Sequence, residues 1–256
     1  VDEDTIELAR MELEDVVSGT FLEGKPILQT VAGTNPTGLE GVMQALDDIA
    51  EQQRPTQGRF RLPVDRAFIQ KGFGTVVTGT ARAGTIRDGT DVRIEPIGLK
   101  ARIRGMQVHG NPVTQTQAGL RTAINLAGIE RDDLARGMVV IEEPSLAPAS
   151  IIDVHLQLLD SAPLLQTRTR ARLLVGTAEV MAVVEIIDDD LVTPGDETWA
   201  QLRTEEPIVA MPGDRFILRR ESPVETLGGG TILDPWAPRA RKKRHSAIAQ
   251  ELTALR

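Results

Sequence analysis

The chain has 256 residues, 41% of them hydrophobic, which is enough to build packed cores. It contains no cysteine, which excludes disulfide scaffolds, cysteine-ligated zinc and thiol nucleophiles. The net charge of −8 is uneven: residues 1–55 carry 12 acidic and 3 basic side chains, a balance of −9, which leaves +1 for residues 56–256. Because phosphate binding depends on local basic patches, the composition permits a nucleic-acid partner.

The sequence predicts a cytoplasmic protein with no membrane partner. No stretch reaches the apolar length that a bilayer span needs. The first four residues, Val1-Asp2-Glu3-Asp4, are acidic and unlike a signal or transit peptide.

The first region predicts a helix, a strand and a second helix. Residues 2–18 place apolar side chains at helical spacing among acids, Lys25–Val31 is a short apolar run, and Leu39–Ala50 has an apolar face after a turn cluster. These elements are too few to bury their own faces, so we expect them to belong to a larger domain. Residues 51–58 have low hydrophobicity and predict a linker.

From Arg59 the apolar period changes to two, which predicts short strands of a barrel or sandwich. The expected strands of this region are Arg59–Val64, Gly74–Ala81, Asp91–Glu95, Arg102–Val108, Arg121–Leu126 and Met138–Glu142. Leu146-Ala147-Pro148 marks a boundary, and a second β region follows with alternation at 152–158 and through 170–187. It closes near residues 233–235, and residues 241–256 predict a final helix.

Two segments, 61–68 and 71–79, resemble the second domain of translational GTPases. The glycines of Lys71-Gly72-Phe73-Gly74 lie between strands, so they allow tight backbone approach and do not form a phosphate loop before a helix. Within the translational GTPases, the chain most specifically resembles the selenocysteine-specific elongation factors of bacteria. This resemblance rests on segments 64–68, 106–110 and 119–128 and, above all, on the run from Gly213 to Pro235.

This resemblance implies a mainly β fold with two consecutive antiparallel β-barrels, preceded by a short α/β remnant. It assigns residues 1–54 to the end of a GTPase domain and 55–145 to barrel domain 2, which binds the aminoacyl end. It assigns 146–235 to barrel domain 3, which contacts tRNA, and 236–256 to a basic linker toward further domains. Two positions depart from the family pattern: Val31-Ala32 replaces the Ser-Ala guanine loop, and Leu174 stands where relatives often have His.

The resemblance also implies GTP and Mg²⁺ in a longer parent protein, whereas this chain is expected to hold neither and to have no catalytic or metal site. No Gly-x-x-x-x-Gly-Lys-Ser/Thr sequence is present, and the proline of Gly24-Lys25-Pro26 lacks an amide for a phosphate cradle. We therefore expect no GTP hydrolysis by this chain, with Val31 and Ala32 as a remnant of the guanine loop. The implied partners are selenocysteinyl-tRNA, delivered at recoded UGA codons, the ribosome and, through further domains, a messenger RNA hairpin.

The positions matching the family's amino-acid pocket are Asp65, Arg66 and Arg121. A selenol ionises below neutral pH, and a selenolate suits guanidinium donors that stay charged at any biological pH. A neutral seryl hydroxyl would leave such donors uncompensated. The alternative is an Asp–Arg salt bridge that only fixes strand register at the barrel rim. Convergence of the three side chains on one cavity would favour the pocket.

Further basic residues are weaker candidates for tRNA contacts. Arg215, Arg219 and Arg220 lie near a glycine-rich segment, Gly228–Gly230, which we interpret as a tight turn. Arg102 and Arg104, with Arg82 and others, either meet phosphates or form a solvated barrel face. An alternative function is a structural or tRNA-binding barrel pair of an elongation factor Tu-like GTPase without selenocysteine specificity.

Overall fold

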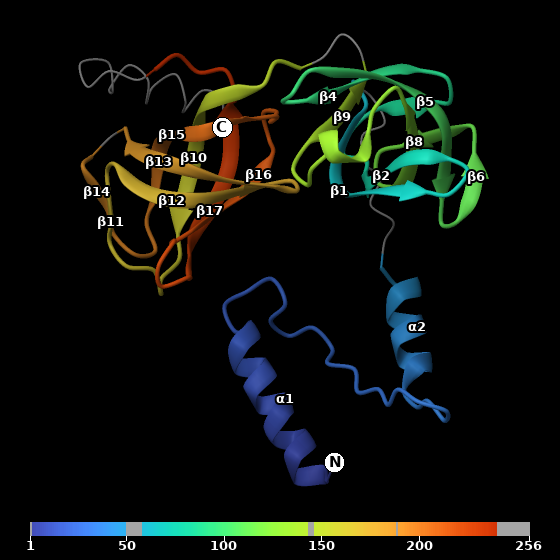
Figure 1. Cartoon of the computed structure of the whole chain (residues 1–256). Coiled ribbons are helices and arrows are strands. Elements are labelled where there is room, and N and C mark those ends of the chain that lie inside the picture. The colour runs from blue at the N-terminus through green and yellow to red at the C-terminus, as the bar shows by residue number, and fades with distance from the viewer. Residues whose placement is uncertain (1, 50–57, 143–145, 188, 240–256) are drawn as a thin grey trace. The chain divides into compact units, whose positions relative to one another are not determined.

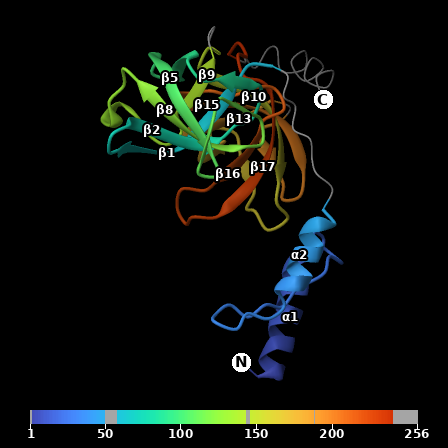
Figure 2. The ribbon, with the colours of Figure 1, turned by 90° about the vertical axis from the view of Figure 1, so that its right-hand side faces the viewer.

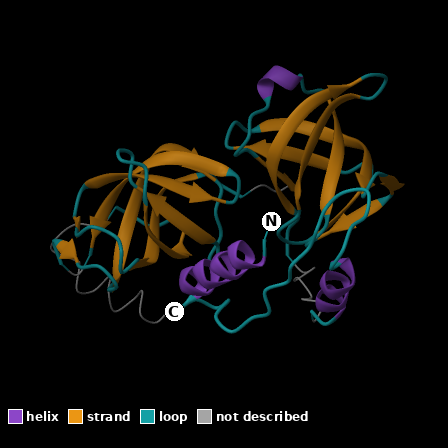
Figure 3. Cartoon of the chain, turned by 90° about the horizontal axis from the view of Figure 1, so that it is seen from below, coloured by secondary structure: helices purple, strands orange, loops and turns teal. Residues whose placement is uncertain are grey.

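The computed structural model describes residues 2–49, 58–142, 146–187 and 189–239. The chain divides into two compact units, Val1–Gln53 and Arg54–Arg256. Among the described residues, both α-helices belong to the first unit, whereas the strands and one short 3₁₀ helix belong to the second (Figures 1 and 3). Within the described ranges, no helix is long and apolar enough to cross a membrane.

The first unit contains α1 (Glu3–Val17) and α2 (Leu39–Asp47), so both expected helices are confirmed. Asp2 caps α1 by accepting a hydrogen bond of 2.9 Å from the Thr5 amide. The expected strand at 25–31 is wrong, because only Val31 pairs, in an isolated bridge with Thr37. A short apolar run without a neighbouring strand has no partner for its ladder hydrogen bonds.

None of the described residues of the first unit is buried. Apolar side chains of both helices are exposed, from Leu8 at 57% and Val16 at 75% to Met43 at 60% and Leu46 at 57%. The unit therefore has no hydrophobic core of its own, as its small number of elements predicts.

The first barrel closes in the order β4-β9-β1-β2-β8-β5, with β5 pairing back to β4. A hairpin strand, β6, extends the edge of β5. The strands of this barrel and its accessory pair are β1 (Arg61–Gln70), β2 (Gly74–Thr80), β3 (Thr85–Arg87), β4 (Asp91–Glu95), β5 (Leu99–Val108), β6 (Asn111–Val113), β7 (Gln115–Gln117), β8 (Arg121–Ala127) and β9 (Val139–Glu142). A short 3₁₀ helix, η1 (Arg131–Asp133), joins β8 to β9.

The second barrel closes in the order β10-β15-β13-β12-β16-β17 (Figure 2). Its strands and a two-stranded appendage are β10 (Ala149–Leu158), β11 (Leu165–Gln166), β12 (Thr169–Val175), β13 (Ala178–Ile186), β14 (Leu191–Val192), β15 (Glu197–Ile208), β16 (Arg215–Arg219) and β17 (Thr226–Asp234). The expected mainly β fold with two barrels is confirmed.

Two details of the second barrel differ from the expected elements. The alternation at 170–187 is a hairpin of β12 and β13 rather than one strand, because Gly176 at a φ of 59° allows a turn. Gly228–Gly230 is not a turn but the middle of β17, where a Cβ would collide with backbone carbonyls of β10 and β16. The linker at 51–57 and the final helix at 241–256 lie outside the described residues.

Each barrel has its own core of alternating inward side chains. Phe60, Leu62 and Ile124 are fully buried in the first, and Ile152 and Leu173 in the second. Aromatics are scarce, so aliphatic side chains from facing strands fill both interiors. A smaller apolar cluster joins Val139 and Ile141 of the first barrel to Val209 of the second.

Candidate functional site: an ion pair and a pocket on the first barrel

A β-bulge positions two of the three predicted pocket residues. The register between β1 and β2 shifts between Val64 and Arg66, so Asp65 is the inserted residue. Bulges re-aim side chains and recur beside functional sites. Asp65 is half-buried and Arg66 is exposed.

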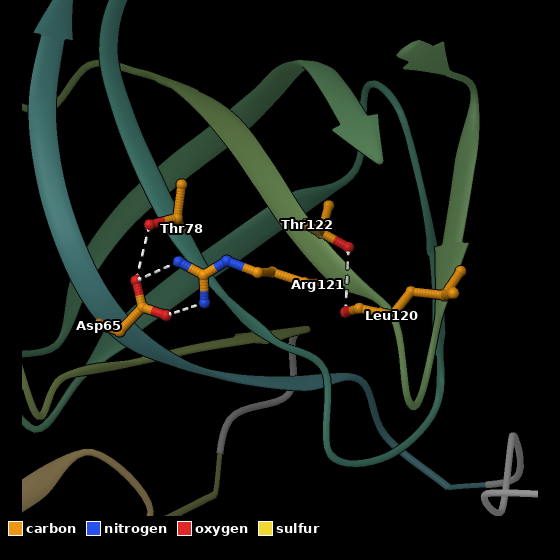
Figure 4. Close-up of polar contacts among 5 residues, drawn as sticks. All are labelled: Asp65, Thr78, Leu120, Arg121 and Thr122. Atoms are coloured by element: carbon orange, nitrogen blue, oxygen red, sulfur yellow. Dashed lines mark hydrogen bonds and ion pairs between the residues drawn. The ribbon is translucent and has the colours of Figure 1, made fainter. Parts of the chain in front are cut away.

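Asp65 and Arg121 form a bidentate ion pair across the outer surface of the barrel (Figure 4). Arg121 begins on β8 and its guanidinium crosses β2 to reach Asp65 on β1, with one donor distance of 3.2 Å. Thr78 on the intervening β2 donates its hydroxyl to the same carboxylate at 2.7 Å. A span of two strand spacings, about 10 Å, requires a side chain as long as arginine.

The charges around Asp65 favour its ionised form. Burial acts to raise the pKa of the Asp65 carboxyl, but hydrogen bonds from Arg121 and Thr78, with the charges of Arg121 and Arg66, outweigh it and lower the pKa. The same hydrogen bond and the charge of Asp65 raise the pKa of Arg121. Arg66 makes no hydrogen bond or ion pair with the described residues, so its guanidinium is available to a ligand.

A pocket of about 190 Å³ lies on the same outer face and was not anticipated from the sequence. Outward positions alternate along β8, so Arg121, Ala123 and Asn125 share a face, and the last two line the pocket. Phe73 supplies an aromatic wall that is 57% exposed. The Asn125 amide donates to the Phe73 carbonyl at 2.7 Å, while its buried Oδ1 accepts no hydrogen bond from the described residues.

The pocket and the ion pair are neighbours rather than one cavity. Asp65, Arg66 and Arg121 are not among the pocket's lining residues. The Arg121 and Asn125 positions are four residues apart on one strand, about 13 Å along β8. Asp65 and Arg121 therefore meet in an ion pair, as the alternative of a register-fixing salt bridge also expects, and Arg66 is within electrostatic reach of Asp65, but the three side chains do not converge on this pocket.

The other arginines considered for tRNA contacts differ in their protein partners. Arg102 pairs loosely with Asp91 at 3.7 Å, whereas Arg104 lines the pocket. Arg220 is held by Glu225 at 2.9 Å on the second barrel. Arg219 is half-buried on β16, and its Nε has no partner among the described residues.

The described residues do not fit a GTP–Mg²⁺ site. Residues 25–30 form no helix after Gly24, so no helix N-terminus faces that turn. The Val31 amide donates to the Thr37 carbonyl at 3.0 Å, which uses a group that a guanine would need, while Ala32 lies exposed beside it. In the described ranges no group of three or more His, Asp or Glu side chains is arranged to hold a metal ion.

Comparison with known proteins shows which proteins this chain is similar to. Residues 151–239 match the model of the selenocysteine-specific elongation factor β-barrel domain, and residues 74–141 match that of elongation factor Tu domain 2. Over its full length the chain is 38% identical to a selenocysteine-specific elongation factor from Desulfomicrobium baculatum and 29% identical to one from Escherichia coli. It spans 40% of the length of either relative.

Solved structures agree. A crystal structure of a bacterial selenocysteine-specific elongation factor matches 99% of this chain with a TM-score of 0.80 and 25% identity, and the match covers 41% of that structure. The crystal structure of translation elongation factor SelB from Methanococcus maripaludis, in its apo form, matches 93% of this chain, and the match covers 55% of that structure. Its TM-score is 0.79 at 24% identity, so this similarity bears on the fold alone. In sequence and in fold, the chain is thus related along its whole length to the selenocysteine-specific elongation factors.

Proposed function

We propose that the outer face of the first barrel binds the aminoacyl end of selenocysteinyl-tRNA within a longer factor that delivers this tRNA to the ribosome. The observation that carries the proposal is the Asp65–Arg121 pair beside an open pocket on the same strands. GTP, Mg²⁺ and contacts with a messenger RNA hairpin are assigned to parts of that factor other than the residues described here.

Three groups have distinct parts in this proposal. Asp65 fixes the orientation of Arg121 and presents a carboxylate with a lowered pKa to the aminoacyl ammonium. Arg66, without a protein partner among the described residues, and the exposed edge of Arg121 face the selenolate. Because Arg121 keeps Asp65 as a partner in the free protein, a seryl group leaves one guanidinium, that of Arg66, uncompensated rather than two.

The pocket supplies a place for the terminal nucleobase. Its volume of about 190 Å³ is below the ~300 Å³ lower bound typical of sites for whole drug-sized ligands. Phe73 offers the base a stacking surface. The interval between Asn125 and Arg121 leaves room for a ribose and an aminoacyl ester.

Equilibrium binding of the full-length protein to three forms of one tRNA tests the proposal. Selenocysteinyl-tRNA is expected to bind most tightly, seryl-tRNA at least tenfold more weakly, and deacylated tRNA more weakly than selenocysteinyl-tRNA. Equal affinity for the two aminoacyl forms would favour the alternative, a barrel pair of elongation factor Tu type without selenocysteine specificity, which the match of residues 74–141 supports.

A further inference from the structure

The Asp65–Arg121 ion pair lies at the surface of the first barrel, and by itself it is a weak constraint on its two side chains. The Arg121 side chain is 54% exposed and that of Asp65 is 23% exposed. Exposed ion pairs are screened by water, and holding two side chains in one geometry costs rotamer freedom. A site that distinguishes ligands by charge needs its guanidinium held in place before the ligand binds. A further group is therefore needed to hold the pair.

Thr78 is placed to be that group. It lies on β2, between β1, which carries Asp65, and β8, which carries Arg121. Its register partners are Arg66 on β1 and Ala123 on β8. A strand paired on both sides is fixed in the sheet, and a β-branched side chain has a restricted χ1. The Thr78 hydroxyl is therefore more firmly placed than the end of the long Arg121 side chain.

The Thr78 hydroxyl and the Arg121 guanidinium share the Asp65 carboxylate (Figure 4). Thr78 donates to Asp65 Oδ1 at 2.7 Å. Arg121 donates to the same oxygen at 3.2 Å and to Oδ2 through its other terminal nitrogen. An ionised carboxylate only accepts hydrogen bonds, so the proton of the Thr78 hydroxyl is directed at Asp65. The carboxylate is thus held from the intervening strand as well as by Arg121.

The backbone beside the β-bulge brings Asp65 within reach of Thr78. Asp65 is the residue inserted where the register of β1 against β2 shifts. A Cβ at Gly79, the residue after Thr78, would lie 2.1 Å from the Pro63 carbonyl oxygen. Glycine is therefore required for β1 and β2 to approach so closely at this point, and this approach sets the distance between the carboxylate and the hydroxyl.

We propose that Thr78 is a positioning residue for selenocysteine recognition: its hydroxyl holds the Asp65 carboxylate, and through it the Arg121 guanidinium, in the arrangement that receives the amino acid. This inference rests on the proposed function and adds to it a residue that carries no charge. Thr78 acts through Arg121, so it affects the discrimination between selenocysteine and serine only while Arg121 is present. A hydroxyl that merely completed the hydrogen bonding of the barrel surface would have no such effect.

The ratio of the Kd values of the full-length protein for seryl- and selenocysteinyl-tRNA tests this role. Thr78→Val removes the hydroxyl and keeps the β-branched shape. It is expected to reduce the ratio about fivefold, because it removes a hydrogen bond to a charged group. Thr78→Ser keeps the donor and is expected to leave the ratio within about twofold of the wild type. The matched control is Thr85→Val, a half-buried threonine on β3 whose hydroxyl bonds to none of the described residues.

A double-mutant cycle separates positioning from a direct contact with the ligand. In an Arg121→Ala background, Thr78→Val is expected to leave the ratio unchanged, because the guanidinium that Thr78 positions is absent. An equal reduction in both backgrounds would contradict a role through Arg121, as would an equal reduction in Thr85→Val. If Arg121→Ala alone leaves the ratio unchanged, the proposed function fails. A ratio that Arg121→Ala lowers and Thr78→Val does not overturns only the role of Thr78.

A measurement without tRNA tests the positioning itself. The order parameter of the Arg121 Nε–H bond, obtained by nitrogen NMR relaxation on the full-length protein labelled at arginine, reports how firmly the guanidinium is held. It is expected to fall in Thr78→Val and to keep its wild-type value in Thr78→Ser. An unchanged order parameter in Thr78→Val would contradict the proposal. Thermal melts establish that the variants fold, and Thr78→Ala takes the place of Thr78→Val if the valine variant does not.

Discussion

Arg61 on β1 of the first barrel and Asp214 before β16 of the second form a bidentate ion pair that links the two barrels. The side chains are 10% and 19% exposed, so the pair is largely removed from water. Removing one partner of a buried pair leaves a desolvated charge, which destabilises proteins by about 3–5 kcal/mol.

We therefore expect Arg61→Ala to lower the free energy of unfolding by about 3 kcal/mol, measured by chemical denaturation. The control is Arg102→Ala, whose partner Asp91 lies 3.7 Å away with both side chains mostly exposed. That variant is expected to change stability by less than about 1 kcal/mol. Similar losses of unfolding free energy in the two variants would show that the Arg61–Asp214 pair stabilises the protein no more than an exposed ion pair does.

Gly230 predicts a strict size limit in the second barrel. A Cβ at this position of β17 would overlap the His155 carbonyl oxygen on β10, which belongs to the paired backbone of the barrel and cannot move aside. Gly230→Ala is expected to unfold the second barrel or to destabilise it by more than about 3 kcal/mol. In Gly213→Ala the new Cβ meets open space, and only the positive φ of 86° opposes it, at about 1–2 kcal/mol. Near-UV circular dichroism of the two tryptophans and thermal melts distinguish these results.

Asp153 predicts a pH dependence of stability. Burial and, to a smaller extent, the charge of Asp234 raise the pKa of the Asp153 carboxyl to about 6, against a hydrogen bond of 2.7 Å from Gln201 that lowers it. Since the folded state binds the proton more tightly than the unfolded chain, whose ordinary value is 3.8, stability falls as pH rises from about 4 to about 6. Asp153→Asn should therefore stabilise the protein at pH 7 by roughly 3 kcal/mol and leave it nearly unchanged at pH 4.

Denaturation midpoints between pH 4 and pH 7 check this prediction. Glu206→Gln, an exposed position on β15, is the control and should leave the pH profile as it is. If the denaturation midpoints of Asp153→Asn and of the wild type changed in parallel between pH 4 and pH 7, Asp153 would not titrate in this pH range.

We expect a substitution that fills the pocket to weaken tRNA binding without changing the discrimination between selenocysteine and serine. Ala123 lies between Arg121 and Asn125 on the outward face of β8 and lines the pocket. Ala123→Phe should fill it and weaken selenocysteinyl- and seryl-tRNA equally, by at least tenfold. Ala127→Phe, on the same face of the strand but outside the pocket, should leave both affinities near the wild-type values. A change in the ratio of the two affinities would place the pocket within the amino-acid site instead.

The sequence predicted the barrels well because inward and outward side chains alternate in strands such as β4 and β8. It failed at Lys25–Val31, where apolar composition suggested a strand but no neighbouring strand exists to pair with it. It also failed at Gly228–Gly230, because glycines that permit close strand packing look the same in sequence as glycines of a turn.

The candidate site was predictable only in part. The resemblance to the family predicted that Asp65 and Arg121 belong to one site, and they form an ion pair. The β-bulge that orients Asp65 could not be predicted, because it does not alter the pattern of apolar residues. The pocket is lined by Gln70 at the end of β1, Phe73 in the turn before β2 and Asn125 on β8, residues of ordinary types that the pairing of β1, β2 and β8 brings together. Likewise, Arg61 and Asp214 are 153 positions apart and meet only because the two barrels pack together.

The central claim is that charge at Arg121 and Arg66 distinguishes selenocysteine from serine. The most direct measurement is the ratio of Kd values of the full-length protein for seryl- and selenocysteinyl-tRNA, compared between the wild type, Arg121→Ala and Arg66→Ala. The exposed Arg131→Ala serves as the charge control. Either of the Arg121→Ala and Arg66→Ala substitutions is expected to reduce the ratio by about 10- to 100-fold, or about 1.4–2.8 kcal/mol, while the control leaves it unchanged. An unchanged ratio in both Arg121→Ala and Arg66→Ala would contradict the central claim.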